Sequence, residues 1–170
     1  MRKIIGVIMF CLALLIISGC KEVLTKREQI TSGVTVLLPE KFEKVDTNDG
    51  QILFNSKIGS ANFRVFVLKN MRLDTIGLEK IKAGMEKNVT RFIEPLQGKI
   101  VQRKDTLYGK IVQSDFDFEI NSSTGSKIGA GRFVVKENLF IGFIYETILP
   151  ETSSNKALRS SFFNSVQIDQ

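Results

Sequence analysis

Three carboxylates stand at alternate positions in one short stretch of this 170-residue chain. Asp115, Asp117 and Glu119 alternate with apolar side chains in the stretch SDFDFEIN. Alternate residues of a β-strand share one face, so the three carboxylates are expected to form a line. Such a line can bind calcium or magnesium, and a pair of carboxylates can hydrolyse a glycosidic bond. The alternative is a solvated strand face whose acids pair with Arg132 and Lys136 on a neighbouring strand.

The alternative is favoured, because a calcium loop places its acids at fixed positions around a glycine and this stretch does not. The sequence therefore predicts no cofactor, no metal and no catalytic residue. The three acids remain the only candidates for a metal site.

A glycine-rich stretch follows the acids. Gly125, Gly129 and Gly131 lie in NSSTGSKIGAG, which superficially resembles a phosphate-binding loop. A phosphate-binding loop of that kind leaves a strand and opens a helix, whereas this stretch is followed by a strand pattern. Residues 121–131 are therefore predicted to form a flexible loop of unassigned function.

A serine and a lysine near the carboxyl end are spaced for a helix. Ser160 follows Lys156 by four residues, so one helix face would carry both side chains. A serine–lysine dyad also needs an oxyanion hole, and no motif for one accompanies the pair. The pair therefore indicates no nucleophile.

The composition excludes several kinds of enzyme. The chain has no histidine, which rules out a histidine base, a serine–histidine–aspartate triad and a zinc site built on imidazole. The two cysteines, Cys11 and Cys20, both lie in the amino-terminal segment, so no disulfide is expected in the folded domain. These exclusions favour a protein that is not an enzyme.

The first twenty residues, MRKIIGVIMFCLALLIISGC, read as an export signal. Arg2 and Lys3 precede an uncharged run over residues 4–17, and two small residues end the run. The run is too short for a transmembrane helix, which needs about 20 apolar residues. The alternatives are an ordinary signal peptide and an uncleaved anchor. An exported chain is not expected to bind nucleic acid. Loss of two cations with the signal peptide would reduce the net charge from +6 to about +4.

The end of this segment, Ile17-Ser18-Gly19-Cys20, resembles the lipobox of bacterial lipoproteins. The resemblance implies cleavage between Gly19 and Cys20, a diacylglyceryl group on the Cys20 sulfur, and usually acylation of the new amino terminus. The protein would then be held in the cell envelope by lipid. Lys21 stands where an aspartate would favour the inner membrane of an enteric Gram-negative cell. The resemblance therefore favours the outer membrane, facing the periplasm, if the source is Gram-negative.

Three segments are expected along the chain. Residues 1–19 form the signal peptide, and residues 20–32 form the lipidated cysteine and a polar tether. Residues 33–170 form a single globular domain, which is long enough to bury a hydrophobic core.

The elements of this domain are predicted from the spacing of its apolar residues. Residues 61–69 and 139–148 are strands that are apolar on both faces, except for Arg64, so both faces need cover. Residues 74–94 form an amphipathic helix with Asp74 as its N-cap, and residues 154–163 form a second helix. The fold class is therefore α+β, a mainly antiparallel sheet between helices on both faces.

Two stretches resemble PsbP-like and DcrB-like domains. Gly33–Val45, GVTVLLPEKFEKV, is similar to their first strand, and Ser160–Ile168, SSFFNSVQI, is similar to their carboxyl-terminal helix and tail. The resemblance implies a PsbP-like α/β/α sandwich. It also implies a binding or assembly module on membrane complexes and brings no catalytic residues.

These observations predict a membrane-anchored envelope lipoprotein that acts as a non-enzymatic protein-binding or assembly module, with an envelope protein as its partner. One alternative is a periplasmic carrier of an apolar ligand such as a lipid or lipopeptide, because twelve of the thirteen phenylalanines follow the signal peptide. The other alternative is a hydrolase that uses carboxylates alone. A large apolar cavity would favour the carrier, two convergent carboxylates would favour the hydrolase, and an exposed apolar patch rimmed by charge would favour the binding module.

Overall fold

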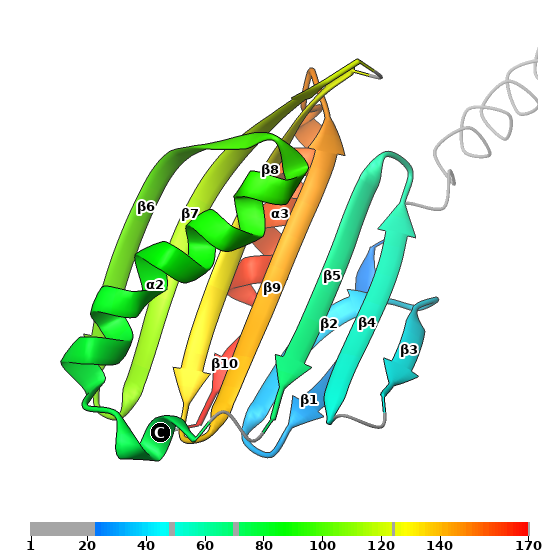
Figure 1. Cartoon of the computed structure of the whole chain (residues 1–170). Helices are drawn as coiled ribbons and strands as arrows, with labels where there is room; N and C mark the ends of the chain where they lie inside the picture. Colours follow the sequence, from blue (N-terminus) through cyan, green and yellow to red (C-terminus); the bar gives the residue numbers. More distant parts are fainter. Residues whose placement is uncertain (1–22, 48–49, 70–71, 124, 170) are drawn as a thin grey trace, which may run out of the picture.

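Two antiparallel sheets and two α-helices make up the described part of the chain (Figure 1). The computed structural model describes residues 23–47, 50–69, 72–123 and 125–169. No helix within these ranges is long and apolar enough to cross a membrane. The predicted signal peptide, with Gly19 and Cys20, lies outside the described residues.

The larger sheet has seven strands in the order β3-β4-β5-β9-β8-β7-β6, and every neighbouring pair in it is antiparallel. Its strands, in chain order, are β3 (Glu43–Asp46), β4 (Gln51–Ile58), β5 (Ala61–Leu68), β6 (Gly98–Tyr108), β7 (Ile111–Ser122), β8 (Gly125–Lys136) and β9 (Leu139–Ile148). The smaller sheet has three strands in the order β1-β2-β10, which are β1 (Leu24–Thr31), β2 (Val34–Pro39) and β10 (Gln167–Ile168).

The helices lie on opposite faces of the larger sheet (Figure 1). Helix α2 (Leu78–Ile93) packs on β6, β7 and β8, and α3 (Ser153–Asn164) packs with the smaller sheet on the other face. Short 3₁₀ turns, η1 (Leu73–Thr75) and η2 (Glu94–Leu96), flank α2. This arrangement confirms the predicted α+β class, with helices on both faces.

One helix cannot cover a whole face of this sheet. Seven strands at about 4.8 Å spacing span about 30 Å, whereas a helix with its side chains is about 10–12 Å across. Helix α2 lies over the β6–β8 half, and among the described residues no helix lies over β4 and β5 on the same face (Figure 1). The fold therefore leaves half of one sheet face to be made polar or to be covered by something else.

The core beneath α2 is aromatic. Phe133 is almost fully buried, and its ring lies 4.8 Å from that of Phe116 and 5.1 Å from that of Phe140, centroid to centroid. Phe66 and Phe92 complete the cluster at 5.9 and 5.5 Å from Phe133. The phenylalanine rings therefore pack mainly against one another here.

Two glycines of the predicted flexible loop lie inside β8, so that prediction is wrong. The phenyl rings of Phe118 and Phe116 lie directly over Gly129 and Gly131, where a Cβ atom would collide with them. Residues 125–136 pair with β7 along their whole length. The glycines leave room for rings from the neighbouring strand, and a strand of small residues was mistaken for a loop.

The polar tether predicted for residues 20–32 is wrong from Leu24 onward. Residues 24–31 form β1, which pairs with β2 through a turn at Gly33, whose φ is +67°. Ile30 is buried, while the neighbouring Gln29 is exposed. An edge strand with one solvent-exposed face has a mostly polar composition. For that reason the composition of this stretch predicted a linker.

Two predicted boundaries also move. Helix α2 begins at Leu78 with Gly77 as its N-cap, so the prediction of Asp74 as N-cap is wrong. The polar triplet Lys104-Asp105-Thr106 predicts a turn between two strands, and this prediction is wrong, because β6 runs unbroken from Gly98 to Tyr108. The turn falls instead at Gly109, whose φ of +57° suits glycine.

A buried polar network fixes the start of α3 to the sheet. The Tyr145 hydroxyl lies 3.1 Å from the Asn155 carbonyl oxygen and 3.2 Å from a Glu151 carboxylate oxygen. The Asn155 side chain donates to Thr147 Oγ1 at 2.8 Å and to Ser60 Oγ at 2.9 Å. Burial, and then the nearby Glu151 carboxylate, raise the pKa of Tyr145 above its usual value.

Alkaline pH should therefore destabilise the fold through Tyr145. The unfolded chain releases the phenolic proton near pH 10, and the folded chain holds it to higher pH, so this stabilisation is complete below pH 10 and lost above it. Tyr145→Phe should lower the free energy of unfolding by about 1–2 kcal/mol at pH 7 and flatten its fall above pH 10. Urea unfolding at pH 7 and pH 10.5 measures both effects. An equal fall in variant and wild type would contradict this role, although Tyr108, whose pKa is also raised by burial, leaves some dependence in both.

Candidate functional site

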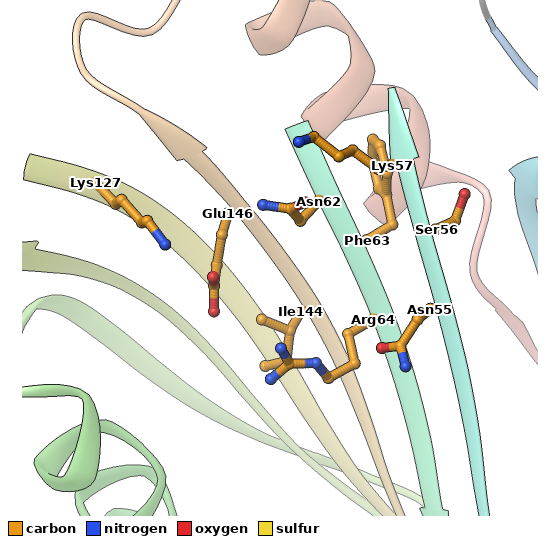
Figure 2. A pocket seen from close by; sticks show the side chains of 9 residues that line it. All are labelled: Asn55, Ser56, Lys57, Asn62, Phe63, Arg64, Lys127, Ile144 and Glu146. Carbon is orange, nitrogen blue, oxygen red and sulfur yellow. The ribbon is translucent and has the colours of Figure 1, made fainter. Parts of the chain in front are cut away.

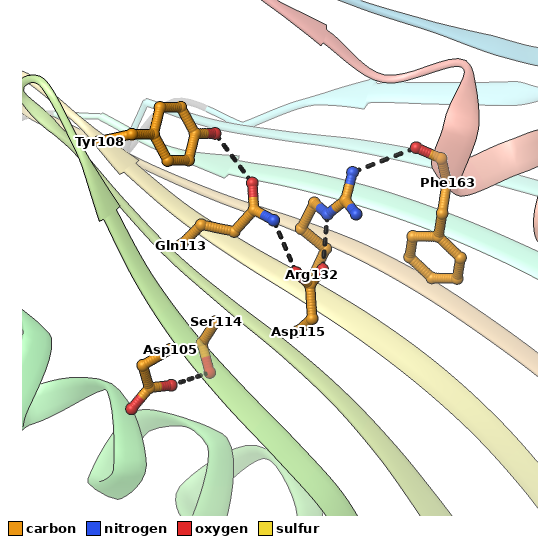
Figure 3. Close-up of polar contacts among 7 residues, drawn as sticks. All are labelled: Asp105, Tyr108, Gln113, Ser114, Asp115, Arg132 and Phe163. Carbon is orange, nitrogen blue, oxygen red and sulfur yellow. Dashed lines mark hydrogen bonds and ion pairs between the residues drawn. The ribbon is translucent and has the colours of Figure 1, made fainter.

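The predicted acidic line lies on the face of β7 opposite α2, and its first member is engaged in a polar network (Figure 3). Asp115 Oδ1 lies 2.6 Å from Arg132 Nε on β8, and Arg132 Nη1 donates to the Phe163 carbonyl oxygen at 3.1 Å. Gln113 Nε2 donates to Asp115 Oδ2 at 2.6 Å, and Tyr108 Oη donates to Gln113 at 2.9 Å. Asp115 thus joins β7 to β8 and to the end of α3. The predicted pairing with Arg132 is confirmed.

The pairing predicted for Lys136 is wrong, because its ammonium donates to the backbone carbonyl of Asp169 at 2.7 Å. Asp117 lies 4.0 Å from Arg159 of α3, and Glu119 is exposed. Alternate strand residues lie about 6.8 Å apart, whereas Ca²⁺ needs all of its oxygens within about 2.6 Å. Among the described residues, no group of three or more histidine, cysteine, aspartate or glutamate side chains is placed to hold a metal.

The serine and lysine spaced for a dyad are both exposed on α3. Lys156 and Ser160 share no hydrogen bond within the described residues, and the start of α3 is occupied by the Tyr145 network. Asp115, Asp117 and Ser160 do line one hollow of about 280 Å³, together with Arg132 and Arg159. Its two carboxylates stand beside these arginines, and Lys156 does not line it.

The face of the sheet that α2 leaves bare carries a different set of side chains. We call it the open half-face and define it by residues of β4, β5, β8 and β9 on the α2 side of the sheet, outside α2 or at the margin of the core beneath it: Leu53, Asn55, Lys57, Asn62, Arg64, Phe66, Leu68, Lys127, Ile144 and Glu146. Strand register sets these residues side by side, since Asn55 pairs with Arg64 and Asn62 pairs with Glu146.

A cup of about 500 Å³ occupies the upper part of the open half-face (Figure 2). Its floor is Ile144, which is buried, and polar side chains from four strands stand around it. Figure 2 shows Arg64 and Asn55 on one side of the cup and Lys127 and Glu146 on the other. The cup is shallow and wide, so it fits a surface contact better than an enclosed small ligand.

The cup is predominantly cationic. Lys57, Arg64 and Lys127 line it, against the single acid Glu146. No described acid lies within salt-bridge distance of these three cations, whereas Arg132 and Arg159 on the opposite face both pair with carboxylates. These cations are therefore available to an anionic group from outside the domain.

An apolar niche of about 220 Å³ adjoins the cup along β5. Phe66 and Leu68 of β5 line it with Phe92, Phe133 and Phe140, and Arg91 and Asn88 of α2 also border it. Phe66 is half-buried and leans over Gly142, where a Cβ atom would collide with its ring. Gly142 leaves room for this ring, and the niche is an apolar patch with the charged Arg91 at its border.

Sequence reasoning missed this site, although two residues signalled it. Glu146 is the only charged residue of β9 and Arg64 is the only charged residue of β5, and Arg64 was treated as an exception. Its position shows that one end of β5 is uncovered on the α2 side. The other cup residues carry no spacing signal, because they come from four strands that only the sheet register brings together.

The fold defines a class before any particular relative is considered. A mostly antiparallel sheet with a helix on each face, ending in a carboxyl-terminal helix and a short strand, is the α+β arrangement of PsbP-like and Mog1-like proteins. No protein-family model matches the sequence, and no curated protein matches it.

Solved structures give the particular likenesses. The solution structure of cyanobacterial PsbP (CyanoP) from Synechocystis sp. PCC 6803 superimposes with a TM-score of 0.57 at 14% identity, covering 85% of this chain and 92% of that one. The Ran-binding protein Mog1p of Saccharomyces cerevisiae gives a TM-score of 0.51 at 9% identity, covering 84% of this chain and 94% of that one. LpqN, a protein involved in cell envelope biogenesis of Mycobacterium tuberculosis, gives 0.50 at 10% identity, covering 85% and 90%. At these identities the likeness establishes the fold.

Proposed function

We propose that this protein is a membrane-anchored lipoprotein of the cell envelope whose folded domain is a non-enzymatic protein-binding or assembly module. The observation that carries the binding role is the open half-face. It combines three cations that have no described acidic partner with an adjoining apolar niche. An exposed apolar patch rimmed by charge is typical of a surface that meets another protein.

The anchor is proposed from the sequence Ile17-Ser18-Gly19-Cys20, with lipid on Cys20. Because β1 begins at Leu24, only three residues would separate the lipidated cysteine from the folded sheet. Three residues span at most about 10 Å, so the domain would sit against the membrane surface and not on a long tether. In a Gram-negative cell, Lys21 after the cysteine favours the outer membrane, with the domain facing the periplasm.

The comparisons support a binding role without defining it. One structural neighbour is a Ran-binding protein and another takes part in envelope biogenesis. Asp115 and Asp117 line one hollow of about 280 Å³, but each carboxylate there stands beside an arginine, Arg132 or Arg159, so the pair gives little support to a hydrolase.

The carrier of an apolar ligand is a weaker candidate. The cup has a polar rim, and the niche, at about 220 Å³, is smaller than the 300–1,000 Å³ of a typical small-molecule pocket. The phenylalanine rings beneath α2 are in mutual contact and leave little space between them.

The proposed lipid anchor predicts how replacement of Cys20 changes the location of the protein. Cys20→Ala should move the protein from the membrane fraction to the soluble fraction, or leave an uncleaved precursor, because lipid can be attached only at that sulfur. Mass spectrometry of wild-type protein should show an amino-terminal Cys20 carrying acyl chains. A wild-type Cys20 without lipid would overturn the anchor and leave the binding module to be judged separately.

The binding module is tested by site-specific photocrosslinking in intact cells. A photoreactive amino acid replaces Asn55 in the cup or, as a control, Lys110 in the turn between β6 and β7 at the far edge of the sheet. A protein adduct formed from position 55 and absent from position 110 supports the proposal. Lipid adducts alone at position 55 would favour the carrier, and equal adducts at both positions would show that the cup is not a specific surface.

A further inference from the structure

We infer that the open half-face binds an extended, acidic segment of the partner, with a carboxylate at Arg64 and an apolar side chain two residues away in the niche beside Phe66. This inference rests on the proposed function and adds the chemistry of the segment that is recognised.

The charge of the cup selects an anion. Lys57, Arg64 and Lys127 face the cup with one opposing acid, and none of the three has a described acid within 4 Å. Arginine binds a carboxylate through two parallel hydrogen bonds, which makes Arg64 the strongest recognition group of the three. A cationic partner would meet only Glu146.

The spacing of β5 selects an extended segment. Arg64 and Phe66 lie on the same face of one strand, so their side chains emerge about 6.8 Å apart. The cup is lined from Asn62 to Arg64 and the niche from Phe66 to Leu68, so the two are consecutive along the strand. A partner segment in extended conformation repeats its own side chains at the same interval. An acid and an apolar residue separated by one position would therefore reach both.

The size of the niche selects a side chain. About 220 Å³ lined by four phenylalanines and Leu68 accommodates one aromatic or aliphatic group, and it is too small to enclose a whole lipid or drug-sized ligand. Arg91, at the border of the niche, adds a further cation on the α2 side and strengthens the preference for an acidic neighbour of that group.

The probe is a labelled peptide with the core Asp-Ser-Phe-Ser-Asp, which reads the same in both directions and so needs no assumption about strand polarity. Its fluorescence anisotropy is followed with the full-length protein in nanodiscs of neutral lipid. We expect saturable binding that weakens at least tenfold with Arg64→Glu and changes less than twofold with Lys110→Glu. Replacing both peptide acids by lysine should abolish binding. Replacing the phenylalanine by serine should weaken binding about tenfold.

Three results would overturn the inference. They are no binding of the acidic peptide, equal binding of the acidic and lysine peptides, or Arg64-dependent binding of phosphatidylglycerol vesicles in place of the peptide. If the peptide fails while photocrosslinking at position 55 still traps a protein, the partner chemistry is wrong and the binding module stands. If both fail, the proposed function fails with it.

Discussion

Replacing Phe133 by alanine is expected to lower the free energy of unfolding by about 3–5 kcal/mol, the largest effect of a single side chain in this domain. Phe133 is about 1% exposed and lies within 6 Å of four other phenyl rings. Its removal loses both the transfer free energy of the ring and the edge-to-face contacts with Phe116 and Phe92.

Denaturant unfolding followed by circular dichroism measures this loss, with Phe163→Ala as the matched control. Phe163 is only half-buried on α3 and contacts one phenyl ring, that of Phe162, so its truncation should cost less, about 1–2 kcal/mol. A loss below about 1 kcal/mol at Phe133 would mean that the cluster is not tightly packed. A loosely packed cluster of this kind would revive the carrier, since rings that line a ligand cavity contribute less to the stability of the unliganded protein.

The periodicity of the sequence was sufficient for most elements of the fold. The alternation in SDFDFEIN placed Phe116, Phe118 and Ile120 on the buried face of β7, where the structure has them. The three-to-four spacing of Ile81, Met85 and Val89 marked the buried stripe of α2. These patterns survive because burial on one face constrains every second or every third to fourth residue, and that constraint is visible along the chain.

The elements that the sequence did not predict depend on contacts between separate segments of the chain. Gly129 and Gly131 belong to a strand because phenyl rings from β7 cover them. Neither segment by itself predicts that β7 pairs with β8. Residues 24–31 became β1 because β2 offers it an edge, although its own residues are mostly polar. In both cases the strand forms because it pairs with a neighbouring strand, and its residue composition alone does not predict it.

The candidate site was even harder to predict from the sequence, because it depends on contacts between different strands. The acidic line was visible in the sequence because its residues are neighbours on one strand, yet Asp115 is bonded to Arg132 and serves the structure. The cup was invisible because Asn55, Asn62, Lys127 and Glu146 come from four strands. Its sequence signals are a lone arginine in β5 and a lone glutamate in β9. They point to a surface only when the width of the sheet is compared with the width of a single helix.

Charge reversal at Arg64 is expected to produce the largest functional effect. Arg64→Glu should reduce the amount of crosslinked or captured partner at least tenfold. The substitution removes a bidentate interaction between arginine and a carboxylate, and it places a second carboxylate beside that of the partner. Such a contact between charged groups contributes about 1.5–3 kcal/mol, which corresponds to roughly a tenfold to hundredfold change in affinity. Arg64→Lys keeps the charge and loses the planar geometry, so partial binding should return.

The same variant should leave the fold intact, and this separates a binding role from a structural one. Arg64 is exposed and has no described ion pair, so its replacement should change the free energy of unfolding by less than about 0.5 kcal/mol. Lys110→Glu makes the same change in net charge at the far edge of the sheet and should leave capture within twofold of wild type. Equal losses in both variants would show that capture follows the overall positive charge of the domain. A loss confined to Arg64→Glu, with unchanged stability and recovery in Arg64→Lys, would make the open half-face the recognition surface, because overall charge and stability would then have been held constant.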